Sequence, residues 1–151
     1  MCSSDLAVDL AIMRIMHMGR LHPRHILVPL GSSISDLAAR AAFLVSLARS
    51  FHAQITLYHR GNIARSALPD DYLALRKELQ HHQVSVLERS GSGHIARAIA
   101  LEAVSHHNDL IILGASERGG LRRLFFGNPA GDVMRHPPCN SLLFRPGRQI
   151  P

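Results

Sequence analysis

The stretch from Gly91 to Ala96 carries the spacing best suited to binding a dinucleotide. It reads G-x-G-x-x-A between an apolar run and a helical pattern, and Glu117 lies about 20 residues further on. In a dinucleotide fold these glycines admit the pyrophosphate, and the acidic residue binds the ribose. That fingerprint normally opens the first strand–helix unit, whereas two such units precede it here, so a plain glycine turn is the better interpretation.

The histidines suggest metal chemistry, because the chain contains 11 of them. His81 and His82 are adjacent, as are His106 and His107, and adjacent residues on a helix point in different directions. The remaining close pair, His22 and His25, straddles a proline with no third ligand nearby. We predict no metal site.

Common catalytic templates are missing. Gly119 is followed by a glycine and not by the lysine of a P-loop, and no G-x-S-x-G elbow occurs. Asp70 and Asp71 follow Pro69, as acidic residues do at the start of a helix. We therefore expect a binding module and not an enzyme.

These residues must be positioned by alternating strands and helices. Apolar runs predict strands at 25–30, 54–58, 84–88, 110–113 and 141–144, and helical spacing predicts helices at 36–50, 70–80, 95–104 and 128–135. Such alternation indicates an α/β fold, Rossmann-like, with a single open parallel five-stranded sheet and helices on both faces. Ligands are expected at the carboxyl ends of the strands, in the loops 31–35 and 114–127.

Composition limits the partners. With 151 residues, 46% of them hydrophobic, the chain suits one domain, and its net charge of +6 favours anionic ligands. Aromatic residues make up only 5%, with no tryptophan, so nucleic acid binding is not expected. Cys2 and Cys139 lie far apart and predict no disulfide, which is typical of the cytoplasm.

Residues 1–23 differ from the rest and are predicted to be an N-terminal appendage to a domain at 24–151. The range 7–18 suggests a short amphipathic helix ended by Gly19, and Asp9 and Arg14 make it too polar to span a bilayer. The opening MCSSDL is what a sequencing adaptor would encode from a GTG start, which predicts an artificial start on a truncated gene.

Two stretches resemble a known family. The segment 110–128, LIILGASERGGLRRLFFGN, followed by RHPPC at 135–139, is similar to the C-terminal signature of universal stress proteins, and ILVP at 26–29 resembles their first strand. The similarity covers about 24–145. It implies the α/β fold described above and a regulatory module that binds ATP or AMP.

The resemblance also implies a binding site. The ATP-binding branch of the family has G-x2-G-x9-G-(S/T), in which glycines let the backbone approach phosphates. Matching positions and their neighbours make up the expected site, which comprises Pro29, Gly31, Gly114, Arg118, Gly127 and Asn128.

Several departures from that motif weaken the phosphate site. Glu117 replaces the second glycine and would repel a triphosphate, Asn128 replaces the hydroxyl residue, and Pro129 removes a backbone N–H. Gly31 takes the place of an acidic residue. The arginines in the same loop, at 118, 122 and 123, supply positive charge for an anion. ATP remains the candidate cofactor.

Two apolar groups predict partners. Four large residues of the fourth-strand loop must fold back on the core or face a protein partner. These are Leu121, Leu124, Phe125 and Phe126. The last strand, with Leu142, Leu143 and Phe144, is expected at a sheet edge, where family members dimerise.

Two alternatives to a regulatory module stay open. The chain could be a cytoplasmic domain truncated from a membrane transporter or antiporter, in which case residues 7–18 would connect it to the membrane. It could also be a weak ATP-hydrolysing enzyme, which would need an activated water or nucleophile.

Overall fold

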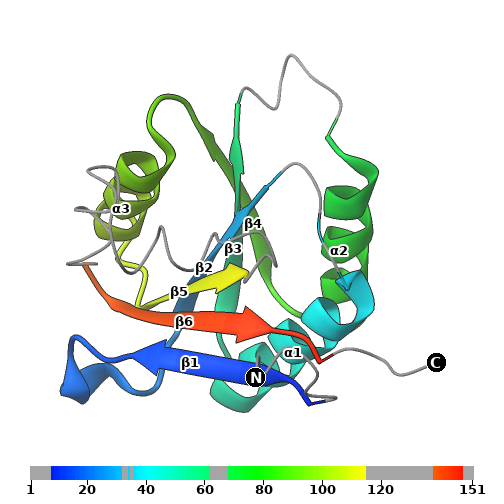
Figure 1. The fold of residues 1–151 in the computed structure, drawn as a ribbon, viewed down its shortest axis with the longest axis horizontal. Coiled ribbons are helices and arrows are strands. Elements are labelled where there is room, and N and C mark those ends of the chain that lie inside the picture. The colour runs from blue at the N-terminus through cyan, green and yellow to red at the C-terminus, as the bar shows by residue number, and fades with distance from the viewer. Residues whose placement is uncertain (1–7, 32–33, 35, 62–67, 115–137, 148–151) are drawn as a thin grey trace, which may run out of the picture.

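The computed structural model describes residues 8–31, 34, 36–61, 68–114 and 138–147. Within them lies a six-stranded sheet with the order β1-β6-β5-β2-β3-β4 (Figure 1). The strands are β1 (Leu10–Arg14), β2 (His25–Leu30), β3 (Gln54–Arg60), β4 (Val86–Gly91), β5 (Leu110–Gly114) and β6 (Asn140–Arg145). The helices are η2 (Met18–Arg20, a 3-10 turn), α1 (Leu37–Phe51), α2 (Asp70–His81) and α3 (Ile95–Ser105).

Strand β2 forms the centre of the sheet. It pairs in parallel with β3 on one side and β5 on the other. Its apolar run is continuous because both faces are covered: Ile26 and Val28 pack on one face and Leu27 on the other. The predicted α/β fold is confirmed, and the five predicted strands, β2 to β6, are parallel.

Helices cover both faces, as the sequence predicts. Helices α1 and α2 bury one stripe each against the first face, where Leu44, Leu75 and Leu79 are almost fully enclosed. Helix α3 packs Ala96, Ile99 and Ala103 against the opposite face. No helix among the described residues is both long and apolar enough to cross a membrane.

The prediction of an N-terminal helix was wrong. Instead of a helix over 7–18, the chain forms β1, which pairs antiparallel with β6 from Leu10↔Arg145 to Arg14↔Ser141. A helix of about 12 residues is marginal alone, whereas a strand beside β6 gains a ladder of backbone hydrogen bonds. Ile12 and Ile15 also favour extended backbone.

Strand β6 is not at the sheet edge, contrary to the sequence prediction. Strand β1 lies along it and takes the edge position (Figure 1), so the sheet has six strands instead of five. Strand β4 begins at Val86 and ends at Gly91, later than expected. The predicted helix at 128–135 lies outside the described residues.

Candidate functional site

The order of the strands places the ligand crevice between β2 and β5. From β2 the chain winds to β3 and β4 on one side, then returns to β5 and β6 on the other (Figure 1). The winding of the strands therefore reverses between the neighbouring strands β2 and β5. Such a switch point opens a crevice at the carboxyl ends of the strands.

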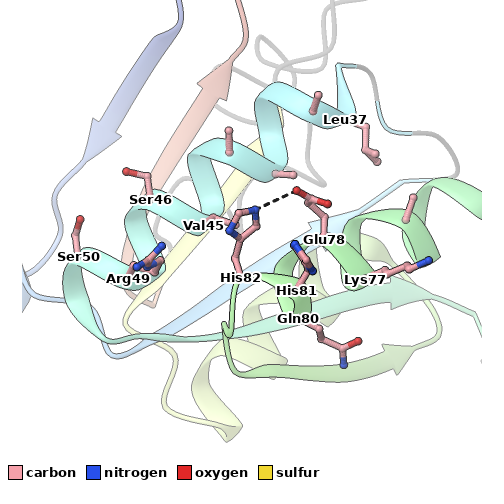
Figure 2. A pocket seen from close by; sticks show the side chains of 14 residues that line it. Leu37, Val45, Ser46, Arg49, Ser50, Lys77, Glu78, Gln80, His81 and His82 are labelled. Carbon is pink, nitrogen blue, oxygen red and sulfur yellow. Dashed lines mark hydrogen bonds and ion pairs between the residues drawn. The ribbon is translucent and has the colours of Figure 1, made fainter.

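A larger hollow lies elsewhere, between α1 and α2 (Figure 2). It measures about 1290 Å³ and is open to solvent along the two helices. Within it, Nε2 of His82 lies 3.2 Å from Oε1 of Glu78, an exposed pair one helical turn apart. Its polar groups are exposed helix side chains such as Arg49 and Lys77, so the switch-point crevice is the better candidate.

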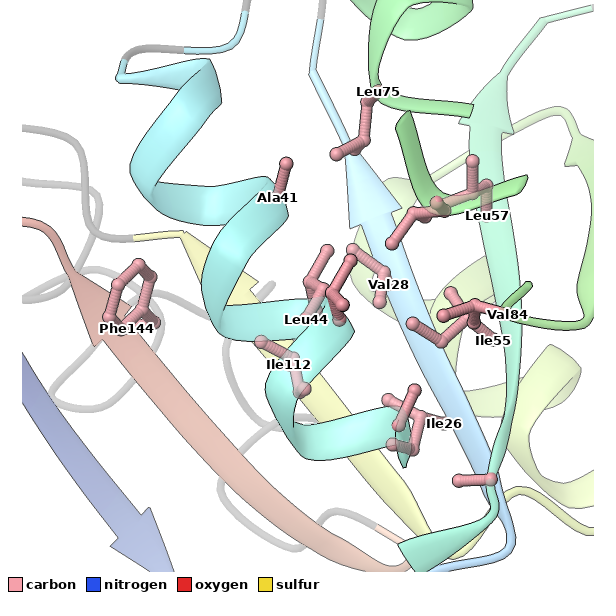
Figure 3. Packing of buried hydrophobic residues seen from close by; sticks show 14 of the residues in the cluster. Ile26, Val28, Ala41, Leu44, Ile55, Leu57, Leu75, Val84, Ile112 and Phe144 are labelled. Carbon is pink, nitrogen blue, oxygen red and sulfur yellow. The ribbon is translucent and has the colours of Figure 1, made fainter. Parts of the chain in front are cut away.

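The crevice itself is a cavity of about 210 Å³. Its walls come from the ends of β2 and β5, from the first turns of α1, and from α2 and β6. Figure 3 labels five of the apolar side chains that line it, which are Val28, Leu44, Leu75, Ile112 and Phe144. The rest of the described lining comprises Pro29, Leu30, Gly31, Ile34, Arg40, Phe43 and Gly114.

An aromatic pair forms one wall. The rings of Phe43 and Phe144 stack with their centroids 4.1 Å apart and their planes at 4°. Opposite, the loop after β2 is tied to α2, because the backbone N–H of Ile34 donates to Oδ2 of Asp71 at 3.0 Å. These contacts hold an apolar enclosure in place.

Arg40 is the charged side chain of that enclosure. Its guanidinium lies directly against Gly114, where a β-carbon would collide with Nη1. Glycine at 114 therefore admits the guanidinium over the backbone of β5. The result is a cation at the carboxyl end of β5, among apolar walls.

The electrostatics of Arg40 follow from its position. Burial lowers the pKa of Arg40 from its usual value, and the negative charge of Asp36 partly offsets this shift. A guanidinium still stays charged at neutral pH. The crevice is therefore suited to an anionic group.

Two further polar atoms lie near the end of β3. In the part of the chain that the structure describes, Nδ1 of His59 and the hydroxyl of Tyr72 are buried without hydrogen-bond partners. The two rings meet edge to face at 5.9 Å. His59 pairs with Leu30 of β2, which lines the crevice.

Burial, followed by the charge of Glu88, raises the pKa of Tyr72 to about 12, while Arg76 acts in the opposite direction.

Three of the predicted site residues meet in this crevice. Pro29, Gly31 and Gly114 all line it. The other three, Arg118, Gly127 and Asn128, lie outside the described residues, as do the departures at Glu117 and Pro129 and the apolar group from Leu121 to Phe126. Three of the six predicted residues therefore line the crevice, and the other three stay predictions.

Sequence reasoning missed Arg40 and Phe43. Both lie on the helix predicted at 36–50, and neither was singled out from the sequence. A usable signal was present, since a helix that starts directly after the switch-point loop must direct its first turns at the crevice. Phe144 was predicted to lie on an edge strand that contacts a second copy and was not included in the expected site, but its side chain lines the cavity.

Metal ligands do not gather in the described ranges, where no group of three or more histidine, cysteine or acidic side chains comes together. The rings of His81 and His82 instead meet edge to face at 5.4 Å.

The parallel strands β2 to β6, the helices on both faces and the crevice at the switch point define a doubly wound α/β class of fold. The universal stress protein family model matches residues 22–145. This chain belongs to the universal stress protein family.

Solved structures with this fold have low sequence identity to the chain. A universal stress protein in complex with cAMP is 18% identical, with a TM-score of 0.61 over 81% of this chain and 96% of that one. One from Archaeoglobus fulgidus DSM 4304 is 18% identical, with a TM-score of 0.66 over 95% of this chain and 52% of that one. An Arabidopsis thaliana family protein with AMP bound is 16% identical, with a TM-score of 0.55 over 80% and 90%.

At these identities the likeness establishes the fold. No curated protein sequence matches the chain.

Proposed function

We propose that this protein binds an adenine nucleotide in the crevice between β2 and β5 and serves as a regulatory module that does not turn the nucleotide over. The observation that carries the proposal is the guanidinium of Arg40 against Gly114 in a largely apolar cavity. Apolar walls suit a base, and a guanidinium suits a phosphate. Two structures that share the fold hold cAMP and AMP.

A nucleotide with one phosphate fits this site better than ATP. The cavity of about 210 Å³ is small beside the roughly 300–1000 Å³ usual for ligand pockets. Its described walls carry one cation, Arg40. In the loop between Gly114 and Gly127, which also contains three arginines, Glu117 replaces a glycine of the ATP-binding motif, and its carboxylate would repel a triphosphate. We therefore expect AMP or cAMP to bind more tightly than ATP.

The expected mode of action is conformational. A ligand seated between α1, β2 and β5 contacts segments that are distant in the sequence. A partner protein that binds preferentially to the nucleotide-bound conformation would therefore respond to the presence of the nucleotide. Cytoplasmic localisation is part of the proposal, and the free, buried thiol of Cys139 is consistent with a reducing compartment.

Calorimetric titration with AMP, cAMP and ATP tests the proposal. Loss of a charge-assisted hydrogen bond costs about 1.5–3 kcal/mol, so Arg40→Gln should weaken AMP binding about tenfold to a hundredfold. Arg49→Gln is the matched control, because Arg49 is an exposed arginine of the same helix that lines the other hollow. Equal AMP affinity in both variants, or no binding by the unmodified protein, would contradict the proposal.

A further inference from the structure

Strand β1 is attached to the sheet mainly through its backbone. Its side chains contribute little burial, since Leu10, Ile12 and Met13 are 43%, 51% and 40% exposed. The five-residue ladder with β6 therefore supplies most of the attachment along the strand. A segment held in this way separates from the core more easily than β6 does.

Asn140 fastens the segment that follows β1. Its side chain is almost fully buried, at 1% exposure for the residue. Oδ1 accepts hydrogen bonds from the N–H groups of Met16 at 2.7 Å and His17 at 2.9 Å. Nδ2 donates to the carbonyl of His17 at 3.3 Å and to that of Arg20 at 3.2 Å. All four bonds run to a segment more than a hundred residues away in sequence, so one amide serves as its anchor.

A second tie lies at the opposite end of the ladder. The backbone N–H of Gly147, just after β6, donates to Oδ1 of Asp9 at 2.7 Å. Residues 9–20 are thus fixed at both ends of β6. We call this range the N-terminal cap.

The strand beneath the cap is strongly apolar. Leu142, Leu143 and Phe144 are buried, and no charged residue interrupts them. Without β1 the outer N–H and C=O groups of β6 would lose their partners. An uncharged apolar strand with a free edge is a template for pairing with another strand.

We propose that the N-terminal cap excludes a second copy of this chain from β6, and that Asn140 is the residue that locks it in place. Release of the cap opens β6 to antiparallel pairing with β6 of the second copy. Strand β6 already accepts an antiparallel neighbour in β1. Identical strands related by a two-fold axis also run antiparallel, and their apolar side chains then meet one another.

The test compares the mass in solution of the full chain with that of Asn140→Ala, by light scattering at micromolar concentration. The unmodified chain should be a monomer, and the variant should have twice that mass. Asn108→Ala is the control, because Asn108 is a buried asparagine whose Nδ2 instead donates to the carbonyl of Glu102. It should stay monomeric.

A second variant tests the same contact in case Asn140→Ala does not fold. Met16→Pro removes one N–H that Asn140 accepts and leaves β6 unchanged, so it should also double the mass while circular dichroism stays native. In both dimers, hydrogen exchange should accelerate at Leu10–Arg14 and stay slow across Asn140–Arg145. A dimeric unmodified chain with protected β1 amides would overturn the proposal. Folded variants that stay monomeric, or dimers with β1 still protected, would also overturn it.

Discussion

The guanidinium of Arg40 lies against the backbone of Gly114, which joins the first turns of α1 to the end of β5 across the crevice. The two residues are far apart in sequence, and only Gly114 belongs to the site expected from the family resemblance. Together they place positive charge inside an apolar cavity at the switch point of the sheet.

Gly114→Ala should weaken AMP binding about tenfold or more, because the added methyl group would collide with Nη1 of Arg40 and push the guanidinium out of place. The fold should survive, since the obstacle is the end of a flexible side chain. Calorimetric titration measures the effect. Gly19→Ala is the control, because a β-carbon there has open space. Unchanged AMP affinity in Gly114→Ala would show that the position of Arg40 does not matter for the ligand.

Leu44→Ala should lower the free energy of unfolding by about 2–5 kcal/mol, since it removes a buried side chain between α1 and the sheet. Leu101→Ala changes the same residue type on α3, where it is exposed, and should cost less than about 0.5 kcal/mol. Urea denaturation followed by circular dichroism compares the two. Similar losses in both variants would argue against the packing described for α1.

Stability should decline in alkali partly through Tyr72. Its pKa is raised mainly by burial, to about 12, whereas an unfolded tyrosine has a pKa of about 10. The folded state therefore holds the proton more tightly, so this contribution is complete below about pH 10 and is lost as the pH rises toward about 12. Urea denaturation at a series of alkaline pH values should show a shallower decline for Tyr72→Phe.

Cys139 acts in the same direction as Tyr72. Its pKa is also raised to about 12, first by burial and then by the charge of Asp109, with Arg20 opposing. Tyr72→Phe should therefore reduce the decline without abolishing it. Parallel curves for the variant and the unmodified protein would contradict the buried environment of Tyr72. At neutral pH the variant should be as stable or slightly more stable, because the lost hydroxyl has no partner among the described residues.

The purified protein should release no phosphate from ATP with magnesium above the background rate. The described crevice provides a cation and apolar walls but no side chain placed to activate water, and the hydroxyl of Tyr72 keeps its proton at neutral pH. A colorimetric phosphate assay measures this. Release that disappears in Arg40→Gln and persists in Arg49→Gln would identify a weak ATP-hydrolysing enzyme instead.

The central strands and three helices could be predicted from the sequence because their signals are local. Strand β2 is a continuous apolar run, and the apolar spacing of α1 marks the stripe that the sheet buries. Gly31 and Gly114 could be located because parallel strands bring their carboxyl ends to one edge, whereas Pro29 was identified through the family resemblance. For each of these elements, burial of its own residues determines both type and position.

The tertiary structure alone decided the edge of the sheet and the charge in the crevice. Residues 10–14 are compatible with a helix or a strand, and the ladder with β6, more than a hundred positions later, selects the strand. The four hydrogen bonds of Asn140 and the approach of Arg40 to Gly114 likewise join distant segments. Periodicity reports which face of an element is buried, but it cannot report which distant backbone or side chain meets that face, because that depends on how the whole chain packs.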